Sequence, residues 1–137
     1  YGMVMGRPNI DLDLEARLQE SVLKLINKGI IRSAHDCSHG GLAVALAECS
    51  ILGGLGFRGV AKIGERWDAC LFGESPSRII VTTTAERSQD LEENAKAAQV
   101  PSTYLGKVAK TNFILPGLID LQISTLISYF ESGLITS

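Results

Sequence analysis

The feature that most constrains the fold is a β-branched pair followed by a polar turn, two glycines and an Ala- and Leu-rich run, all within residues 30–49. Ile30 and Ile31 follow Gly29, and glycine is typical of helix ends, so we expect a strand to begin there. Apolar residues from Leu42 to Cys49 recur at helical spacing, which predicts a helix that begins at the glycines. The chain therefore passes from strand to turn to helix.

Gly40 and Gly41 lie at the predicted start of this helix, where they form part of a candidate anion site. Glycine lets a ligand approach main-chain N–H groups, and a helix N-terminus adds unpaired donors and the positive end of its dipole. Asp36 would orient the turn or hold a metal ion, and Ser38 would donate to a phosphate or cap the helix. These four residues predict a phosphate- or nucleotide-binding loop. The open alternative is a tight loop that only packs the helix against the strand.

The composition indicates one soluble domain. A chain of 137 residues suffices for a core, and we expect a single domain over 1–137 in which 1–10 is an extended lead-in cut from a longer chain. The net charge of -2 and the lack of a Lys or Arg run argue against nucleic-acid binding. The apolar runs are shorter than the roughly 20 residues that cross a bilayer. Cys37, Cys49 and Cys70 lack paired spacing, so we expect a reducing compartment, the cytoplasm.

The alternation of helical and extended patterns predicts an α/β sandwich, with a mixed sheet of about four to six strands covered by helices. The continuous β-branched run Ile79–Thr83 is expected to be a central strand. Ser124 is expected to cap a last helix that closes the domain. Further helices are expected from Asp11 or Asp13 to Gly29 and over 86–99, and further strands over 57–63, 102–108 and 113–115.

His35, Cys37 and His39 alternate along the chain, which leaves two further chemistries open. In an extended strand all three would face one side as the start of a zinc site, but the sequence offers no evident fourth ligand. A Cys37–His35 nucleophile pair is the second possibility, and no orienting third group is evident for it. We therefore predict neither a catalytic residue nor a metal site in this chain.

A second polar cluster consists of Glu74, Ser75 and Arg78, which lie in a turn just before a predicted strand. Charged side chains in such a turn hold a loop by charge-assisted hydrogen bonds. We interpret these three residues, together with His35, as supports of a loop.

Four segments of the chain carry a family resemblance: Ser33 to Glu48, Leu71 to Arg78, Gly106 to Val108, and Leu118 to Leu121. In these segments, which occur in the family's order and cover nearly its whole length, the chain resembles the C-terminal domain of the large synthetase subunits of phosphoribosylformylglycinamidine synthases, in the superfamily of aminoimidazole ribonucleotide (AIR) synthetase. His39 stands where relatives commonly carry an acid, and Cys37 where an aliphatic residue is usual.

The resemblance implies an ATP- and magnesium-dependent amidoligase of de novo purine biosynthesis. Such an enzyme converts formylglycinamide ribonucleotide and glutamine-derived ammonia to formylglycinamidine ribonucleotide. Its synthetase chain is a duplicated pair of halves, each an ATP-handling domain followed by an α/β domain like this one. The implied partners are the remainder of the synthetase chain, a glutaminase subunit and a small bridging subunit.

The family's catalytic bases and metal-ligating acids belong to the ATP-handling domains, so we expect this fragment alone to be inactive. Two alternatives stay open. The chain is a purely structural, pseudo-symmetric module, or it is the equivalent domain of another ATP-dependent member of the AIR synthetase superfamily.

Overall fold

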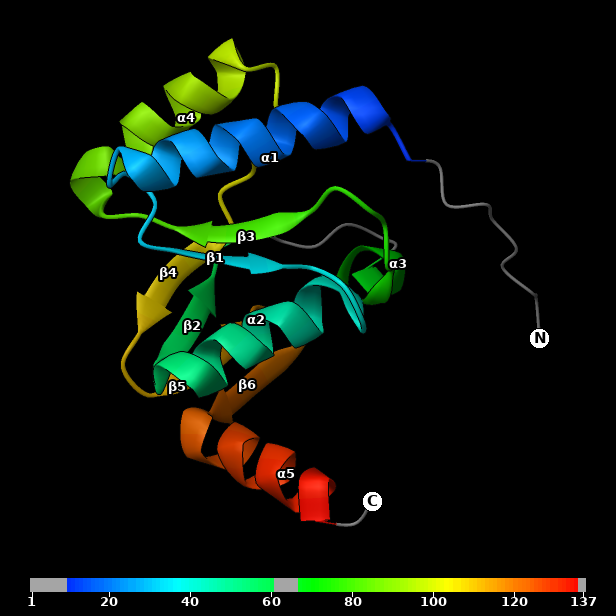
Figure 1. The fold of residues 1–137 in the computed structure, drawn as a ribbon. Helices are drawn as coiled ribbons and strands as arrows, with labels where there is room; N and C mark the ends of the chain where they lie inside the picture. The colour runs from blue at the N-terminus through cyan, green and yellow to red at the C-terminus, as the bar shows by residue number, and fades with distance from the viewer. Residues whose placement is uncertain (1–9, 61–66, 136–137) are drawn as a thin grey trace. The chain divides into compact units, whose positions relative to one another are not determined.

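The computed structural model describes residues 10–60 and 67–135 (Figure 1). Helices and strands alternate over residues 12–97, as the sequence predicts, and three strands then follow one another before the last helix. The backbone divides into two compact units. Unit 1 is formed by Tyr1–Ser38 and Glu74–Ser102, and unit 2 by His39–Gly73 and Thr103–Ser137. The lead-in expected over 1–10 lies outside the described residues, except for Ile10, which is neither helix nor strand.

Unit 1 combines two helices with a two-stranded sheet. Helices α1 (Leu12–Asn27) and α4 (Ser88–Ala97), the latter preceded by the 3₁₀ turn η1 (Ala85–Arg87), lie side by side (Figure 1). Strand β1 (Ser33–Asp36) pairs antiparallel with β3 (Ile79–Thr82). The core between helices and sheet consists of buried Leu25, Ile30 and Ile31, with Val22, Val81 and Leu91 packed against them.

The first helix begins at the predicted residue, but the strand after it begins later than predicted. Asp11 is the N-cap of α1, and its carboxylate accepts a hydrogen bond from the Leu14 N–H at 3.0 Å. Ile30 and Ile31 donate their N–H groups to the Leu25 carbonyl at 3.0 and 3.3 Å, so they complete the helix end. The strand expected from Ile30 therefore begins at Ser33, after both isoleucines have entered the core.

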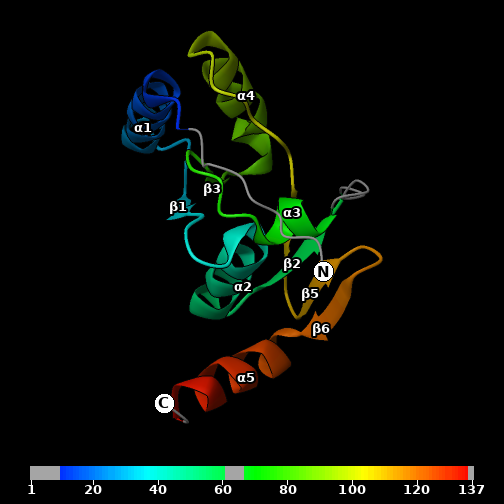
Figure 2. The same ribbon diagram turned by 90° about the vertical axis from the view of Figure 1, so that its right-hand side faces the viewer.

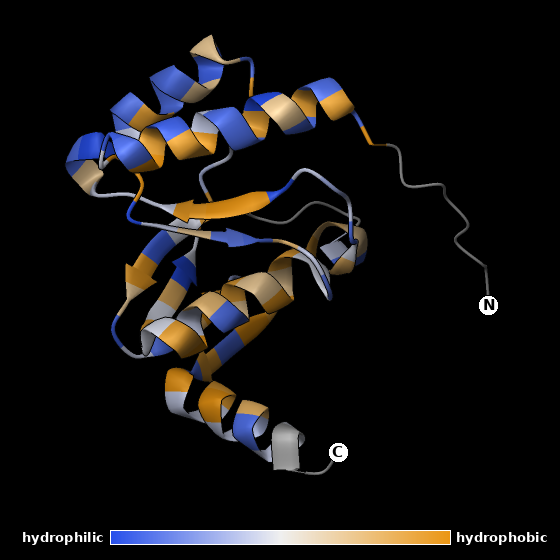
Figure 3. Ribbon diagram, viewed as in Figure 1, coloured by the Kyte–Doolittle hydropathy of each residue, from blue (hydrophilic) through white to orange (hydrophobic). Residues whose placement is uncertain are grey.

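The expectation that Ile79–Thr83 forms a central strand is wrong, because β3 pairs only with β1 within the described residues. Figure 3 shows β3 in hydrophobic colours beside a more hydrophilic β1. Val81 packs against the core cluster, whereas Ile80, on the opposite side of the strand, is also buried. A strand covered on both sides has the continuous apolar pattern of a central strand, whatever the number of its neighbours.

Three helices end in the same backbone motif, which is the Schellman motif. The N–H groups of Ile30, Leu55 and Val100 each donate to a carbonyl five residues earlier, at 3.0, 3.1 and 2.9 Å. The residue before each donor has a left-handed backbone, with φ of 67° at Gly29, 62° at Gly54 and 55° at Gln99. Gln99 is the only one of these three with a side chain, so α4 ends in the least favourable way.

We expect Gln99→Gly to stabilise the chain by about 1 kcal/mol, because glycine adopts the left-handed conformation without a steric penalty. Gly29→Ala is the matched control. A methyl group added at Gly29 meets no atom within 4 Å, so the only expected cost is that of placing a side chain on a left-handed backbone. The control should destabilise by a similar amount, and urea unfolding followed by circular dichroism measures both. Equal stability of Gln99→Gly and the parent would contradict this interpretation.

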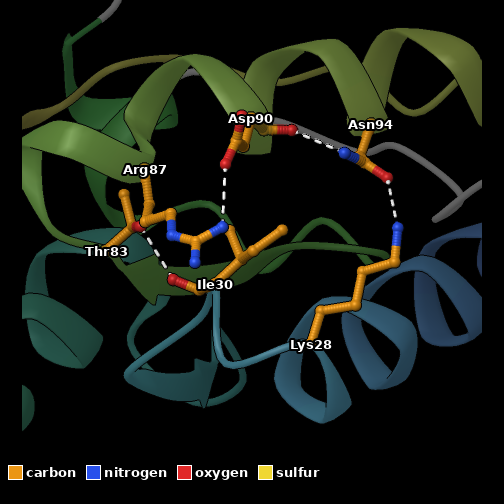
Figure 4. A network of polar contacts seen from close by, with 6 residues as sticks. All are labelled: Lys28, Ile30, Thr83, Arg87, Asp90 and Asn94. Carbon is orange, nitrogen blue, oxygen red and sulfur yellow. Dashed lines mark hydrogen bonds and ion pairs between the residues drawn. The ribbon is translucent and has the colours of Figure 1, made fainter.

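Polar contacts connect the end of α1 with α4 (Figure 4). The Lys28 ammonium donates to the Asn94 side chain at 3.3 Å, and Asn94 donates to the Asp90 carbonyl at 2.7 Å. Arg87 pairs with Asp90 at 3.1 Å on the surface, where such a pair adds little stability. None of these residues is a candidate site residue, so we assign the network to packing within unit 1.

Unit 2 contains the predicted mixed sheet, with four strands. In the order β4-β2-β5-β6, β2 (Gly56–Gly59) is antiparallel to β4 (Gly106–Ala109) and parallel to β5 (Asn112–Leu115), and β5 is antiparallel to β6 (Ile119–Gln122). The predicted α/β class is thus confirmed, with two further strands in the separate sheet of unit 1. The sequence did not predict β6, and part of the strand expected over 57–63 lies outside the described residues.

Helices α2 (Gly41–Gly53), α3 (Trp67–Phe72) and α5 (Ile123–Ile135) complete unit 2. Helix α2 contacts β2, α3 and α5, and Figure 2 shows β6 leading directly into α5. Because α5 begins at Ile123, Ser124 lies in its first turn and is not the predicted cap. Residues 123–133 of α5 are half-buried or exposed, so the core of unit 2 lies instead around Phe113 and Leu71. None of the helices within the described ranges has the length and apolarity required to cross a membrane.

Candidate functional site

The start of α2 has the geometry that its two glycines predict. Gly40 and Gly41 have φ of 75° and 69°, in the left-handed region where glycine alone is unstrained. Helix α2 begins at Gly41, its first turn contains no acidic residue, and Gly40 provides no side-chain cap. This helix end therefore has main-chain donors and no capping side chain, an arrangement that suits an anion.

Close packing gives both glycines a second role, which the sequence did not reveal. A Cβ on Gly40 would lie 2.4 Å from a methyl group of Val44. A Cβ on Gly41 would lie 2.7 Å from the Leu71 carbonyl oxygen and 2.8 Å from that of Gly73. Gly41 is thus the point where the start of α2 meets the main chain at the end of α3, a packing role that differs from the expected packing of helix against strand.

Asp36 and Ser38 precede the glycines in the sequence but belong to unit 1. Asp36 is the last residue of β1, where it pairs with Ile79, so it lies in the strand and not in the expected turn. Both Asp36 and Ser38 are exposed, and Cys37 between them is buried. The Cys37 N–H donates to the Arg78 carbonyl at 3.0 Å, which fixes the backbone between the two polar residues.

The thiol of Cys37 is poorly suited to nucleophilic or metal chemistry. Burial raises its pKa, and the Asp36 carboxylate adds to this effect. The Arg78 charge and a backbone hydrogen bond with Ile80 act in the opposite direction without cancelling it. A thiol with a raised pKa stays protonated at neutral pH, whereas nucleophiles and zinc ligands are thiolates. Within 10–60 and 67–135 no three His, Cys, Asp or Glu residues are grouped to hold a metal ion.

In the second polar cluster, Arg78 contacts Ser75. The Arg78 Nε donates to the Ser75 carbonyl at 3.2 Å, as expected of a residue that supports a loop. Glu74 is exposed, and His35 is half-buried in β1 opposite Ile80. The roles of Glu74 and His35 as supports of the loop therefore stay predictions.

Sequence inspection missed a contact beside this cluster. The Ser77 hydroxyl donates to the Glu15 carboxylate on α1, 62 residues earlier in the chain. This hydrogen bond, followed by a weaker effect of Gln19, holds the pKa of the Glu15 carboxyl below its ordinary value. Ser77 has a φ of 61°, which is rare for a residue other than glycine. No local pattern could have revealed a pair so distant in sequence.

The chain is therefore a mixed α/β domain in which a strand–turn–glycine–helix segment, from β1 to α2, forms the candidate site. Residues 5–115 match the family described as "AIR synthase related protein, C-terminal domain", and the chain belongs to that family.

Curated relatives of the chain include phosphoribosylformylglycinamidine synthase subunits named PurL. The chain is 39% identical over 142 residues to the subunit from Thermomicrobium roseum, which covers 100% of this chain and 19% of the relative. It is 46% identical over 131 residues to the subunit from Thermoanaerobacter pseudethanolicus, which covers 92% of this chain and 18% of the relative. The chain thus spans about a fifth of the length of these proteins.

Solved structures of Thermotoga maritima PurL have the same fold. The complex with AMPPCP superimposes with a TM-score of 0.75 over 89% of this chain and 24% of that chain, at 21% identity. The complex with FGAR gives a TM-score of 0.70 over 82% of this chain and 21% of that chain, also at 21% identity. At this identity the likeness establishes the fold alone.

Proposed function

We propose that the chain is the C-terminal domain of a phosphoribosylformylglycinamidine synthase, an ATP-dependent C–N ligase of purine biosynthesis. The whole enzyme would convert formylglycinamide ribonucleotide, ATP and glutamine-derived ammonia to formylglycinamidine ribonucleotide. The observation that carries this proposal is the identity of 39% to a PurL subunit over the full length of the chain. The alternative, the equivalent domain of another ATP-dependent superfamily member, is supported by the family match over residues 5–115.

The proposed assembly follows from the same relatives. Thermotoga maritima PurL has been solved in complex with ATP, in complex with FGAR, and as PurLQS. We assign to the whole enzyme ATP and magnesium as cofactors, a glutaminase subunit and a small bridging subunit as partners, and the cytoplasm as compartment. The catalytic groups and the metal ligands would come from the remainder of the synthetase chain.

Within this enzyme we propose that the domain contributes a phosphate- or nucleotide-binding loop. The supporting geometry is the start of α2, where Gly40 and Gly41 present a helix N-terminus without a side-chain cap. Ser38, two residues before Gly40, is exposed and has a hydroxyl to donate. Asp36 and Ser38 remain predicted members of the loop, and the contact of Gly41 with the end of α3 supports the structural alternative.

Inorganic phosphate distinguishes a binding loop from a structural one. In the ¹⁵N-labelled chain we expect saturable amide shifts at Gly40, Gly41 and Leu42 as phosphate is added. Ser38→Ala should weaken phosphate binding about fivefold, which corresponds to one hydrogen bond of about 1 kcal/mol.

The matched control uses the N-terminus of α5 in the same unit, which offers helix donors and an exposed serine, Ser124, but no glycine pair. Ser124→Ala should leave the phosphate affinity unchanged, and the amides of α5 should not shift. Shifts of equal size at both helix ends, or none at Gly40 and Gly41, would support the structural alternative.

A further inference from the structure

The segment of unit 1 that presents Asp36 and Ser38 is anchored at Cys37. Cys37 is 6% exposed, while the residues on both sides of it are exposed. The anchor is the hydrogen bond of 3.0 Å from the Cys37 N–H to the Arg78 carbonyl, just beyond the paired strands β1 and β3. The position of Arg78 therefore sets the position of the backbone between Asp36 and Ser38.

Arg78 follows a turn, Ser75 to Ser77, whose backbone is constrained. Its Nε donates to the Ser75 carbonyl at 3.2 Å, which closes the turn on one side. Ser77 before it has a left-handed backbone, with φ of 61°, which residues with side chains rarely adopt. A strained backbone of this kind persists only where the surrounding contacts determine it.

The contact that holds this turn in place comes from α1. The Ser77 hydroxyl donates to one carboxylate oxygen of Glu15, and the Gln19 amide donates to the other oxygen at 2.7 Å. Both carboxylate oxygens are engaged, and the bond from Ser77 has the larger effect in keeping this carboxyl ionised. Ser77 is thus held between Pro76, which fixes its own backbone φ, and a charged acceptor on a separate helix.

We propose that Glu15 and Ser77 are positioning residues: their hydrogen bond holds Arg78 so that the Cys37 backbone is fixed and the neighbouring Ser38 is presented to a phosphate-bearing ligand. This inference rests on the proposed function, because it assigns the pair a role in the binding loop. Neither residue touches the ligand. Both act on the loop indirectly, through the backbone of Ser77, Arg78 and Cys37, which all belong to unit 1.

Amide hydrogen exchange in the chain tests the structural part of this proposal. Ser77→Ala and Glu15→Ala should each speed exchange of the Cys37 N–H about tenfold, since that bond opens locally when Arg78 is released. The Arg32 N–H, which donates to the Thr82 carbonyl at 2.8 Å at the other end of the same sheet, should change little. A parallel change at Cys37 and Arg32, or no change at Cys37, would overturn the proposal.

Two further variants keep the test valid if Ser77→Ala fails to fold. Glu15→Gln retains an acceptor oxygen for Ser77 and should preserve slow exchange at Cys37. Gln19→Ala removes the other partner of Glu15 and leaves the Ser77 contact in place, so it should also behave as the parent. If Glu15→Gln were as disruptive as Glu15→Ala, a hydrogen bond to Ser77 would not be the contact that matters.

Titration with inorganic phosphate, followed at the Ser38 amide, tests the positioning role. Ser77→Ala should weaken phosphate binding at least about threefold, and Glu15→Gln should retain the parent affinity. Faster exchange at Cys37 with unchanged affinity would make the contact merely structural and overturn the inference. A parent chain with no phosphate shift at Ser38 would overturn the proposed loop itself, and with it this inference, before any variant is made.

Discussion

Gly41→Ala is expected to destabilise the chain by about 3 kcal/mol, one of the two largest effects that the structure predicts. The left-handed backbone at φ 69° penalises any side chain. The added methyl would also lie 2.7 and 2.8 Å from two carbonyl oxygens and 2.9 Å from a carbonyl carbon, and main-chain atoms cannot rotate away. The chain has a single tryptophan, Trp67, in the adjacent helix α3, so its fluorescence during urea unfolding measures the loss.

Gly54→Ala separates the two causes of this loss. Gly54 ends the same helix with a φ of 62°, but a methyl there meets no atom within 4 Å. Its replacement should therefore cost only about 1 kcal/mol, the penalty for the backbone conformation. Equal losses for the two variants would show that the contact between α2 and the end of α3 is absent. A large loss of stability in Gly41→Ala also makes this variant a poor probe of ligand binding. Ser38→Ala is the better probe, because Ser38 is exposed and its replacement should leave the fold intact.

Phe113→Ala is expected to cost about 4 kcal/mol, because it empties the centre of unit 2. Phe113 is 2% exposed on the inner strand β5, and its ring centroid lies 5.9 Å from that of Phe57 on the neighbouring strand β2. Truncation removes the buried ring area and the ring contact, and the sheet cannot close the space without moving a strand.

Two controls bracket the Phe113 result. Phe113→Leu keeps most of the side-chain volume and should cost about 1.5 kcal/mol. Tyr129 on α5 is 72% exposed, so Tyr129→Ala should change stability by about 0.5 kcal/mol or less. If urea unfolding gave Phe113→Ala and Tyr129→Ala similar stabilities, the core of unit 2 would not lie at β5.

Elements with local signals were predicted well from the sequence. Asp11 caps α1 through a hydrogen bond three residues ahead, and Gly29 ends the same helix through its left-handed backbone. Both are short-range effects that residue type alone indicates. The glycines at the start of α2 were predicted for the same reason, because a left-handed turn into a helix requires them.

Features set by distant contacts were not predictable. Whether the apolar run of β3 lies in a large or a small sheet depends on its partners, and only β1 pairs with it in the described structure. The strands β4 and β5 are consecutive in sequence, yet β2 lies between them. At the candidate site, the contact of Gly41 with the end of α3 and that of Ser77 with Glu15 each join segments far apart in the chain.

A domain exchange tests the central claim most directly. The segment of Thermoanaerobacter pseudethanolicus PurL that matches this chain, at 46% identity over 131 residues, is replaced by the chain itself. With formylglycinamide ribonucleotide, ATP, magnesium and ammonia, the chimera should form formylglycinamidine ribonucleotide within about tenfold of the parent rate, a loss of about 1.4 kcal/mol at most. The isolated chain should form none. A chimera that is soluble and folded, and still binds ATP, but yields no product would contradict the claim that this chain is a synthetase domain of that enzyme.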